Sequence, residues 1–264
     1  MNNYKGILFF DIDGTLLDSN HKMTDRTKNA LKRAYESGYL LALSSGRCID
    51  GLKIIRDEID IPFIQVSING AYVISHDNKL ISESIIEPSI IREIKKLVDS
   101  FNLDLMYFSK NIWGVEKHGE LYDYEYNVVR ATGTVAPIEQ LIDKVPIHKM
   151  LAYGNPEIKE KFIDVARELF PYLNIVASSP FYVEINNSTS DKGKGLIDTA
   201  KYYDVDISNT YAFGDYDNDL AAFKVAGKSV AMANASNAIL EIADVVTLSN
   251  DEDGVAYFIE NNLL

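Results

Sequence analysis

Short apolar runs alternate along the chain with segments whose apolar residues recur at helical spacing. Residues 7–10, 39–45 and 63–68 are predicted strands, and the unbroken apolar run over 7–10 indicates a strand buried on both faces, which is typical of parallel sheets. Between the first two runs, Thr24 is suited to cap a helix and Gly38 to end it. This order of strand, helix and strand predicts an α/β fold with a Rossmann-like, doubly wound parallel sheet.

The same alternation returns in the last third of the chain. A helix is expected over residues 191–203, a strand over 210–215, and another helix from Asp217. Two more apolar runs, "SVAMA" and "DVVT", predict further strands, and a helix is expected to end the chain. Earlier, Asn69 and Gly70 form a strong hairpin signal after the third strand.

The middle of the chain follows a different pattern. Pro88 opens one segment of helical spacing, and Asn155 with Pro156 opens another. Around these two helices lie strand-like runs over 104–109, 112–117 and 147–154, together with "NIVASS" and "FYVEIN", while residues 118–127 form a polar, tyrosine-rich stretch. We therefore expect a core formed by residues 1–84 and 187–264, interrupted by a small α+β domain over 85–186.

The amino-acid composition excludes some classes of protein. The chain has 264 residues, 47% of them hydrophobic, but no apolar run approaches the roughly 20 residues of a membrane span. The N-terminal "MNNYKGILFF" lacks the features of a secretory signal. The single cysteine, Cys48, excludes an internal disulfide and fits a reducing compartment. These features predict a cytoplasmic protein without a membrane partner.

The net charge of the chain limits which binding partners are expected. The net charge is −13, from 26 basic and 39 acidic residues. No basic stripe is present, so we do not expect a nucleic-acid partner. An anionic substrate would need a metal ion or local cations to offset this field.

Acidic residues end two of the predicted strands. Residues two apart in a strand point the same way, so Asp11 and Asp13 can share a site, while Asp215 ends the strand over 210–215 and Asp219 follows in the next turn. Ligands of open α/β sheets bind beyond the carboxyl ends of the strands. Crowded carboxylates repel unless they are protonated or neutralised by a cation, and a small set of hard oxygen ligands suits Mg²⁺.

Other interpretations of these stretches are weaker. A calcium-binding loop needs glycine at its sixth position and glutamate at its twelfth, whereas Leu16 and Leu220 hold the sixth positions and Ala226 the twelfth of the second loop. The "GKS" at 227–229 suggests a nucleotide-binding loop, but Ala222 stands where the first glycine is required. A purely structural role as turn formers and caps remains open for either pair of acids alone.

Two further residues fit a phosphate site. Ser45 follows the second strand and can donate a hydrogen bond to a phosphoryl oxygen, although a Ser-Gly turn explains this position equally well. Lys192 is expected in the first turn of a helix, where a cation opposes the helix dipole. That unfavourable placement favours a functional role over an ordinary exposed lysine.

The order of these motifs resembles the haloacid dehalogenase (HAD) superfamily of phosphotransferases. "DIDGTLL" resembles its first motif, Ser45 its second, Lys192 its third and "GDYDND" its fourth. "INGA", "VAMANAS" and "SNDEDGVA" resemble the Cof-type, subfamily IIB hydrolases, in which an α/β (C2B-type) cap is inserted between the second and third motifs. Ala233 departs from the glycine common in that family.

The resemblance implies roles for the acids. Asp11 would be the nucleophile and Asp13 the general acid and base. The carboxylates of Asp11 and Asp215 and the backbone carbonyl of Asp13 would hold Mg²⁺, supported by Asp219 through water or Lys192. Aspartate serves as the acceptor in aspartyl-phosphate enzymes, and phosphoryl transfer depends mainly on positioning and charge neutralisation.

The resemblance also implies substrate contacts. Ser45 and Lys192 would bind the transferring phosphoryl group, assisted by Asn218. Arg47, Asn69 and Gly70 would lie near the substrate, although Arg47 could equally form a surface ion pair. Specificity is expected in the cap, where the candidates are His118, Tyr122, Tyr124, His148 and Lys149. Trp113 is expected in the core of the cap.

These implications predict a Mg²⁺-dependent phosphatase acting on small phosphorylated metabolites, chiefly sugar phosphates, through an aspartyl phosphate. A phosphosugar mutase of the same superfamily is the alternative enzyme. A phospho-acceptor regulatory protein is the alternative of another class, which the inserted domain disfavours because receiver domains are far shorter. We expect a monomer or a weak homodimer with a small phosphate ester as its ligand.

Overall fold

The computed structural model describes residues 4–129 and 131–264, apart from the side chains of residues 54 and 128. The first three residues of the N-terminal stretch discussed above therefore lie outside the described residues. The chain divides into two compact units. The first unit comprises residues up to Gly46, Leu52–Ser82 and Asp191–Leu264, and the second comprises Arg47–Gly51 and Glu83–Ser190.

The first unit is the predicted α/β domain. Its strands are β1 (Gly6–Asp11), β2 (Tyr39–Ser44), β3 (Ile64–Ser67), β4 (Tyr72–Ile74), β5 (Leu80–Glu83), β12 (Thr210–Gly214), β13 (Lys228–Ala231) and β14 (Val245–Val246). Its helices are α1 (Asp25–Glu36), α2 (Ile49–Arg56), α6 (Lys192–Tyr202), α7 (Leu220–Val225), α8 (Asn237–Ile242) and α9 (Gly254–Asn262). The end of β5 and the start of α2 extend into the second unit.

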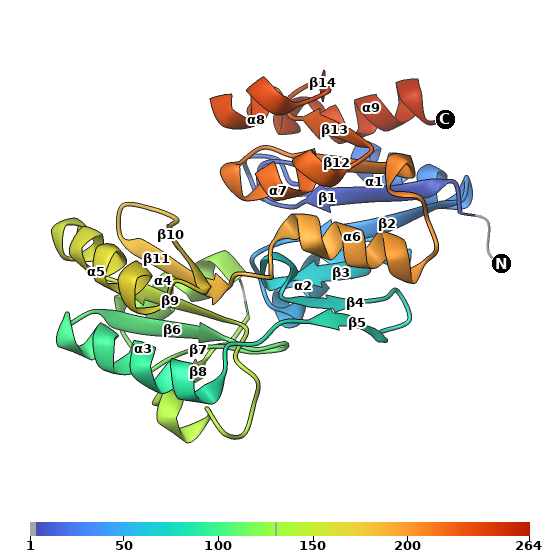
Figure 1. Cartoon of the computed structure of the whole chain (residues 1–264). Coiled ribbons are helices and arrows are strands. Elements are labelled where there is room, and N and C mark those ends of the chain that lie inside the picture. The colour runs from blue at the N-terminus through green and yellow to red at the C-terminus, as the bar shows by residue number, and fades with distance from the viewer. Residues whose placement is uncertain (1–3, 130) are drawn as a thin grey trace. The chain divides into compact units, whose positions relative to one another are not determined.

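Within the described residues these strands form one sheet in the order β14-β13-β12-β1-β2-β3-β4-β5 (Figure 1). The pairs from β14 to β3 are parallel, and β4 runs antiparallel to β3. Leu8 and Phe10 of β1 pack with α1 and α9, whereas Ile7 and Phe9 pack with α6, α7 and α8. Helices therefore cover both faces, and the doubly wound fold is confirmed.

Local sequence signals account for the element ends. The Thr24 side chain accepts a hydrogen bond from the Thr27 backbone and caps α1, as predicted, and Gly38 follows the helix with a φ of 97°. In the predicted hairpin between β3 and β4, Asn69 and Gly70 have φ values of 53° and 86°, the left-handed region that these residue types tolerate best. The predicted helix from Asp217 begins as a 3₁₀ turn before α7.

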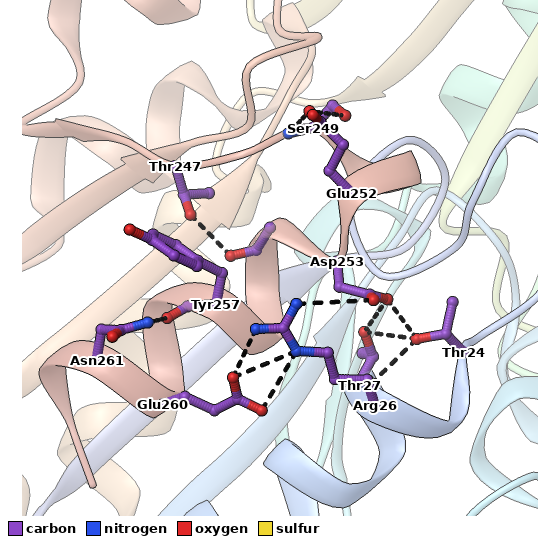
Figure 2. A network of polar contacts seen from close by, with 11 residues as sticks. Thr24, Arg26, Thr27, Thr247, Ser249, Glu252, Asp253, Tyr257, Glu260 and Asn261 are labelled. Carbon is purple, nitrogen blue, oxygen red and sulfur yellow. Dashed lines mark hydrogen bonds and ion pairs between the residues drawn. The ribbon is translucent and has the colours of Figure 1, made fainter.

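A polar network joins α1 to α9 (Figure 2). The Thr24 hydroxyl donates a 2.5 Å hydrogen bond to Oδ1 of Asp253, and Arg26 Nη2 donates one of 2.7 Å to Glu260. Asp253 has a φ of 58° and immediately precedes α9. The "SNDEDGVA" stretch, which belongs to this network, therefore has a structural role in docking the last helix.

The second unit is the predicted α+β domain. Its strands are β6 (Asp104–Phe108), β7 (Trp113–Val115), β8 (Thr134–Val135), β9 (Lys149–Tyr153), β10 (Leu173–Ala177) and β11 (Tyr182–Asn187), and its helices are α3 (Pro88–Ser100), α4 (Glu120–Val129) and α5 (Pro156–Leu169). The described strands form a sheet in the order β10-β11-β9-β6-β7-β8, which is antiparallel except for the pair β7–β8 (Figure 1).

The two faces of this sheet differ. Alternate residues such as Tyr107 and Met150 face α3 and α5 and form the main core of the unit. The opposite face lies against α4, because Trp113 packs against Tyr122 and Tyr182 against Tyr124, with ring centroids 5.0 and 5.8 Å apart. Trp113 is buried, as predicted.

Helix α4 corrects one expectation. The sequence predicted two helices in this unit and assigned none to the polar, tyrosine-rich stretch 118–127, where α4 lies. Three tyrosines and several acidic residues in this stretch obscured its helical spacing, and its stability comes from packing on the sheet rather than from helix propensity. No helix within the described residues has the length and apolar character needed to cross a membrane.

Candidate active site

The strand order of the first unit indicates where a ligand can bind. From β1 the chain continues to β2 and β3 on one side, while β12, β13 and β14 lie on the other. The carboxyl ends of β1 and β12 thus flank the point where the winding reverses, which is the usual ligand position in open α/β sheets. Asp11 is the last residue of β1, and Asp215 follows directly after β12.

Three predicted acids meet at this point. Asp11, Asp215 and Asp219 each offer a carboxylate oxygen, and these oxygens lie within 4.8 Å of one another. Asp11 and Asp219 are 7% and 2% exposed. Acids that follow two separate strands of one sheet therefore lie together, which a role as independent turn formers does not explain.

Lys192 connects two of these acids. Its Nζ donates hydrogen bonds of 2.5 Å to Asp11 Oδ1 and 2.6 Å to Asp219 Oδ1, and its side chain is 0% exposed. Helix α6 begins at this residue, and Asp191 caps the helix by accepting a hydrogen bond from the Lys194 backbone. The prediction that Lys192 is not an ordinary exposed lysine is confirmed.

Asp219 also orders the turn after β12. Its Oδ2 accepts hydrogen bonds from the backbone N–H groups of Asp215 and Tyr216, at 3.1 and 3.2 Å. Gly214 is required beside it, because a Cβ there would lie 2.5 Å from the Asp219 carboxyl carbon. One carboxylate therefore holds both the turn and the lysine.

Asp215 is held from the other side by the loop after β1. Thr15 Oγ1 donates a 2.7 Å hydrogen bond to Asp215 Oδ1. Gly14, with a φ of 84°, lies so close that a Cβ would stand 2.4 Å from Asp215 Oδ2. The glycine and threonine of "DIDGTL" thus shape this loop around the acid of the other strand.

Burial and crowding alter the protonation of these acids. Burial raises the pKa of Asp215 to about 6, opposed by the Thr15 hydrogen bond and increased by the negative charge of Asp219. Burial likewise holds the pKa of Asp11 above its usual range, although the Lys192 charge opposes the shift. Burial lowers the pKa of Lys192, but the charges of Asp11 and Asp219 outweigh it and raise that pKa.

The donor set fits a divalent cation. Three carboxylates stand against one ammonium group, so the ionised site carries an excess of negative charge, and carboxylate oxygens are the ligands that Mg²⁺ prefers. A bound cation would remove the repulsion that raises the pKa values of Asp11 and Asp215.

Asp13 differs from the other predicted acids. It lies beyond the end of β1, its side chain is 43% exposed, and His21 Nδ1 lies 3.7 Å from its Oδ1. Its negative charge is among the causes that raise the pKa of Asp215, so the two carboxyl groups are close enough to interact. Asp13 therefore borders Asp11, Asp215 and Asp219 but is more exposed than any of them.

The predicted phosphate ligand Ser45 lies in a turn that is tied to Asn69. Ser45 is 5% exposed, its backbone N–H donates to Val66, and its carbonyl accepts a 2.9 Å hydrogen bond from the Asn69 N–H. Gly70 lies against the start of α6, because a Cβ there would stand 2.1 Å from the Asp191 carbonyl oxygen. This close approach fixes the first turn of α6, which carries Lys192.

The remaining candidates are spread more widely. Asn218 is exposed in the 3₁₀ turn after β12. Arg47 belongs by its contacts to the second unit. In that unit His148 Nε2 lies 2.9 Å from Glu83 Oε1, whereas His118 and Tyr124 are exposed on and beside α4.

Two residues that sequence reasoning gave no role support the site. Thr15 stands inside the first motif and bonds Asp215. Asn234 Nδ2 donates a 2.9 Å hydrogen bond to the Gly14 carbonyl, and its Oδ1 accepts one from the Asn250 backbone. The residues that Thr15 and Asn234 contact are distant from them in the sequence. The only sequence signal for either residue was therefore its position within a quoted motif.

The chain is similar to known hydrolases along nearly all of its length. The family model for haloacid dehalogenase-like hydrolases matches residues 8–259. The 5-amino-6-(5-phospho-D-ribitylamino)uracil phosphatase YwtE of Bacillus subtilis is 28% identical, over 96% of each chain.

Solved structures show the same likeness. TM0651 from Thermotoga maritima is 26% identical with a TM-score of 0.89, covering 99% of this chain and 98% of that one. A similar fold is found in the subclass IIB sugar phosphatase BT4131, at 24% identity and a TM-score of 0.81, covering 97% of this chain and 98% of that one.

Proposed function

The chain belongs to the haloacid dehalogenase-like hydrolases as a Cof-type phosphatase, and on this premise we propose that it is a subfamily IIB enzyme that uses Mg²⁺ to hydrolyse small sugar or polyol phosphates through an aspartyl phosphate. The observation that carries the proposal is the hydrogen bond between Lys192 and Asp11 beside the neighbouring carboxylates of Asp215 and Asp219. A nucleophilic carboxylate, a cation and further acids are the parts that phosphoryl transfer requires.

In the first half of the reaction, a carboxylate oxygen of Asp11 attacks phosphorus while the bond to the ester oxygen breaks. Asp13 gives its proton to the departing oxygen, which leaves as an alcohol. Lys192 and the Ser45 hydroxyl bind the phosphoryl oxygens, and the lysine also keeps Asp11 oriented for attack.

In the second half, water attacks the phosphorus of the aspartyl phosphate. Asp13, now ionised, takes a proton from this water while the bond between phosphorus and the Asp11 oxygen breaks, which regenerates the Asp11 carboxylate and releases inorganic phosphate. The exposed position of Asp13 suits this role, because the group must exchange its proton twice in each cycle. Asp11, by contrast, is buried and therefore protected from competing proton transfer.

The residues that would hold Mg²⁺ are the carboxylates of Asp11 and Asp215 and the backbone carbonyl of Asp13, with Asp219 in support. When bound, the ion supplies positive charge that neutralises the phosphoryl oxygens and keeps Asp11 ionised. Thr15 and Asp219 orient Asp215 and its turn, so the ligand geometry does not depend on the ion alone.

The names of two relatives support the proposed substrate class. The name of YwtE describes a phosphate on a ribityl group, and that of BT4131 describes a sugar phosphatase. Both therefore point to a phosphate next to a polyhydroxylated carbon chain. For this chain we infer the same class of substrate. We also infer a catalytic core near residues 1–84 and 187–264 with a cap domain inserted between these two segments. The protein is inferred to be a cytoplasmic monomer or weak homodimer.

Steady-state hydrolysis tests the proposal. Phosphate release from p-nitrophenyl phosphate and from a panel of sugar and alditol phosphates is expected to require Mg²⁺ and to vanish in Asp11→Asn. The exposed Asp217→Asn serves as the matched control and is expected to retain activity. Turnover that persists in Asp11→Asn contradicts the proposed nucleophile, and an isomerised phosphosugar in place of inorganic phosphate indicates a mutase.

A further inference from the structure

Ser44 places a buried hydroxyl group beside the proposed nucleophile. It is the last residue of β2, and in the parallel register of β1 and β2 it is the partner of Asp11. Register partners in neighbouring strands point to the same face of a sheet, and the two strands are about 4.8 Å apart. The Ser44 side chain therefore lies next to that of Asp11, on the face that α6 covers.

The other neighbours of Ser44 on this face are apolar. Ala42 lies two residues earlier in β2, and Val66 of β3 is the register partner of Ser44 on the side away from β1. Val66 packs closely against α6, because a Cβ on Gly195 would stand 2.5 Å from its Cγ1. Within the described sheet, Asp11 is therefore the polar side chain that adjoins Ser44.

The Ser44 hydroxyl lacks the partner that a buried polar group normally has. The residue is 0% exposed, and its Oγ has no hydrogen-bond partner among the described residues. Buried hydroxyl groups are nearly always hydrogen-bonded, because an unsatisfied one loses its hydration without replacement. A change of rotamer moves Oγ without moving the strand. The hydroxyl is thus suited to gain a partner in another state of the site.

The carboxylate of Asp11 is held at one of its two oxygens. Among the described residues, its hydrogen bond comes from Lys192, which donates to Oδ1. Oδ2 is therefore the oxygen that remains for attack on phosphorus. The ammonium group of Lys192 is buried and also donates to Asp219. Its attraction to Oδ1 depends on the negative charge of the Asp11 carboxylate.

Formation of the aspartyl phosphate removes that charge. When Asp11 Oδ2 bonds to phosphorus and the bond to the ester oxygen breaks, Oδ1 becomes a neutral carbonyl oxygen. The attraction of Lys192 to Oδ1 falls, while the phosphoryl oxygens offer it new negative charge. Oδ1 then needs another donor in a buried place, and the Ser44 hydroxyl has a proton to donate there.

We propose that Ser44 is a positioning residue whose hydroxyl donates a hydrogen bond to Oδ1 of Asp11 once Oδ2 carries the phosphoryl group. This inference rests on the proposed function, because it requires Asp11 to accept a phosphoryl group. The bond fixes the carbonyl oxygen while Lys192 turns to the phosphoryl oxygens, and it thereby keeps the phosphorus oriented for the attacking water. Ser45 differs, since its hydroxyl is proposed to bind the phosphoryl group itself.

Ser82 provides a matched control. Its Oγ is likewise buried and has no hydrogen-bond partner among the described residues, but it lies in β5, three strands from β2 in the same sheet. Ser82→Ala therefore removes the same kind of hydroxyl group at a distance from Asp11. A difference between Ser44→Ala and Ser82→Ala reports on the position beside Asp11 and not on the loss of a buried hydroxyl as such.

The test compares two anions that differ in their bond to Asp11. Beryllium fluoride with Mg²⁺ imitates a phosphoryl group bonded to a carboxylate oxygen, whereas inorganic phosphate binds without such a bond. In calorimetric titrations, Ser44→Ala is expected to weaken beryllium fluoride binding by about tenfold, the loss of one buried hydrogen bond, and to leave phosphate binding unchanged. Ser82→Ala is expected to change neither affinity. Thermal denaturation verifies that each variant is folded.

Kinetics give a second readout. Ser44→Ala is expected to lower kcat by about tenfold and to leave KM for a phosphate ester unchanged, because the hydrogen bond forms only after the ester has bound. A merely structural role of Ser44 would weaken binding of both anions and of the ester together. An unchanged kcat in Ser44→Ala contradicts the positioning role.

The titrations separate this inference from the proposed function. Equal losses for both anions, or a beryllium fluoride affinity that Ser44→Ala does not alter, overturn the role of Ser44. A wild type that binds beryllium fluoride but releases no phosphate from esters refutes the proposed hydrolysis alone, and the titrations still decide the role of Ser44. A wild type that binds no beryllium fluoride refutes both, because Asp11 is then not a phosphoryl acceptor.

Discussion

Lys192 Nζ donates a 2.5 Å hydrogen bond to Asp11 Oδ1, although the two residues are 181 positions apart in the chain. The same ammonium donates to Asp219 Oδ1 at 2.6 Å. One buried cation thus joins the end of β1, the start of α6 and the turn after β12. Its removal is expected to affect both catalysis and folding.

Lys192→Met is expected to lower kcat by at least about a hundredfold, since loss of one preorganised donor to a developing charge has this effect. In the metal-free variant, the Lys192 ammonium group no longer lies beside the three carboxylates. Its midpoint of thermal unfolding at pH 8 is therefore expected to be lower than that of the metal-free wild type. Kinetics and calorimetry measure the two effects. Lys194→Met, an exposed change on the same helix, is the control, and a comparable loss of activity in it contradicts the assignment.

Metal-free protein is expected to lose stability as the pH rises. The pKa of Asp215 is raised from 3.8 to about 6, so folding stabilises its protonated form, and this contribution is lost from about pH 4 through about pH 6. Asp11, whose pKa is also raised, extends the loss to higher pH. The midpoint of thermal unfolding in EDTA, followed from pH 4.5 to 8, measures this decline.

Mg²⁺ is expected to reverse that decline, because it binds the ionised carboxylates. Its stabilising effect is therefore larger at pH 8 than at pH 5. Asp215→Asn is expected to flatten the pH profile in EDTA, whereas the exposed Asp217→Asn is not. A Mg²⁺ effect of equal size at both pH values argues against titration of the acids in this range.

Gly70→Ala is expected to destabilise the first unit by about 2 kcal/mol or more. Gly70 has a φ of 86°, and a Cβ would overlap the Asp191 carbonyl at 2.1 Å. Because this contact fixes the first turn of α6, kcat is also expected to fall through displacement of Lys192. Gly119→Ala is the matched control: a Cβ there meets nothing within 4 Å, and its unfolding free energy is expected to stay within about 0.5 kcal/mol of wild type.

Thr15→Val is expected to weaken Mg²⁺ binding while preserving the fold. The substitution keeps the shape of the buried side chain but removes its 2.7 Å hydrogen bond to Asp215. Since that bond lowers the pKa of Asp215, its loss leaves the carboxyl group more often protonated and poorly oriented. The Mg²⁺ concentration for half-maximal activity is expected to rise about tenfold, and Thr15→Ser to restore it.

The fold was largely predictable because its signals are local. The apolar runs of β1, β2 and β3, the Thr24 cap and the Pro88 helix start all depend on neighbours within a few positions. Helix α4 was missed for the opposite reason. Its tyrosines and acids mask the helical period, and the sheet face that stabilises it is built from distant strands.

Several residues of the candidate site could be predicted from the sequence, but their arrangement in space could not. Asp11, Asp215 and Lys192 were identifiable from motif and strand position. The exposed side chain of Asp13, the Thr15 bond to Asp215 and the contact of Gly70 with Asp191 were not, because each depends on which loops meet after folding.

The amino-acid sequence by itself determined the alternation of strands and helices and the interruption by a second unit. It also determined which acids stand at the strand ends. These features follow from hydrophobic periodicity and short-range sterics. Only the tertiary structure decided that β12 pairs with β1, which brings Asp215 and Lys192 to Asp11 from 204 and 181 positions away in the chain. It likewise decided that Ser44 lies beside Asp11. Strand pairing depends on the packing free energy of the whole sheet, and no local segment contains that information.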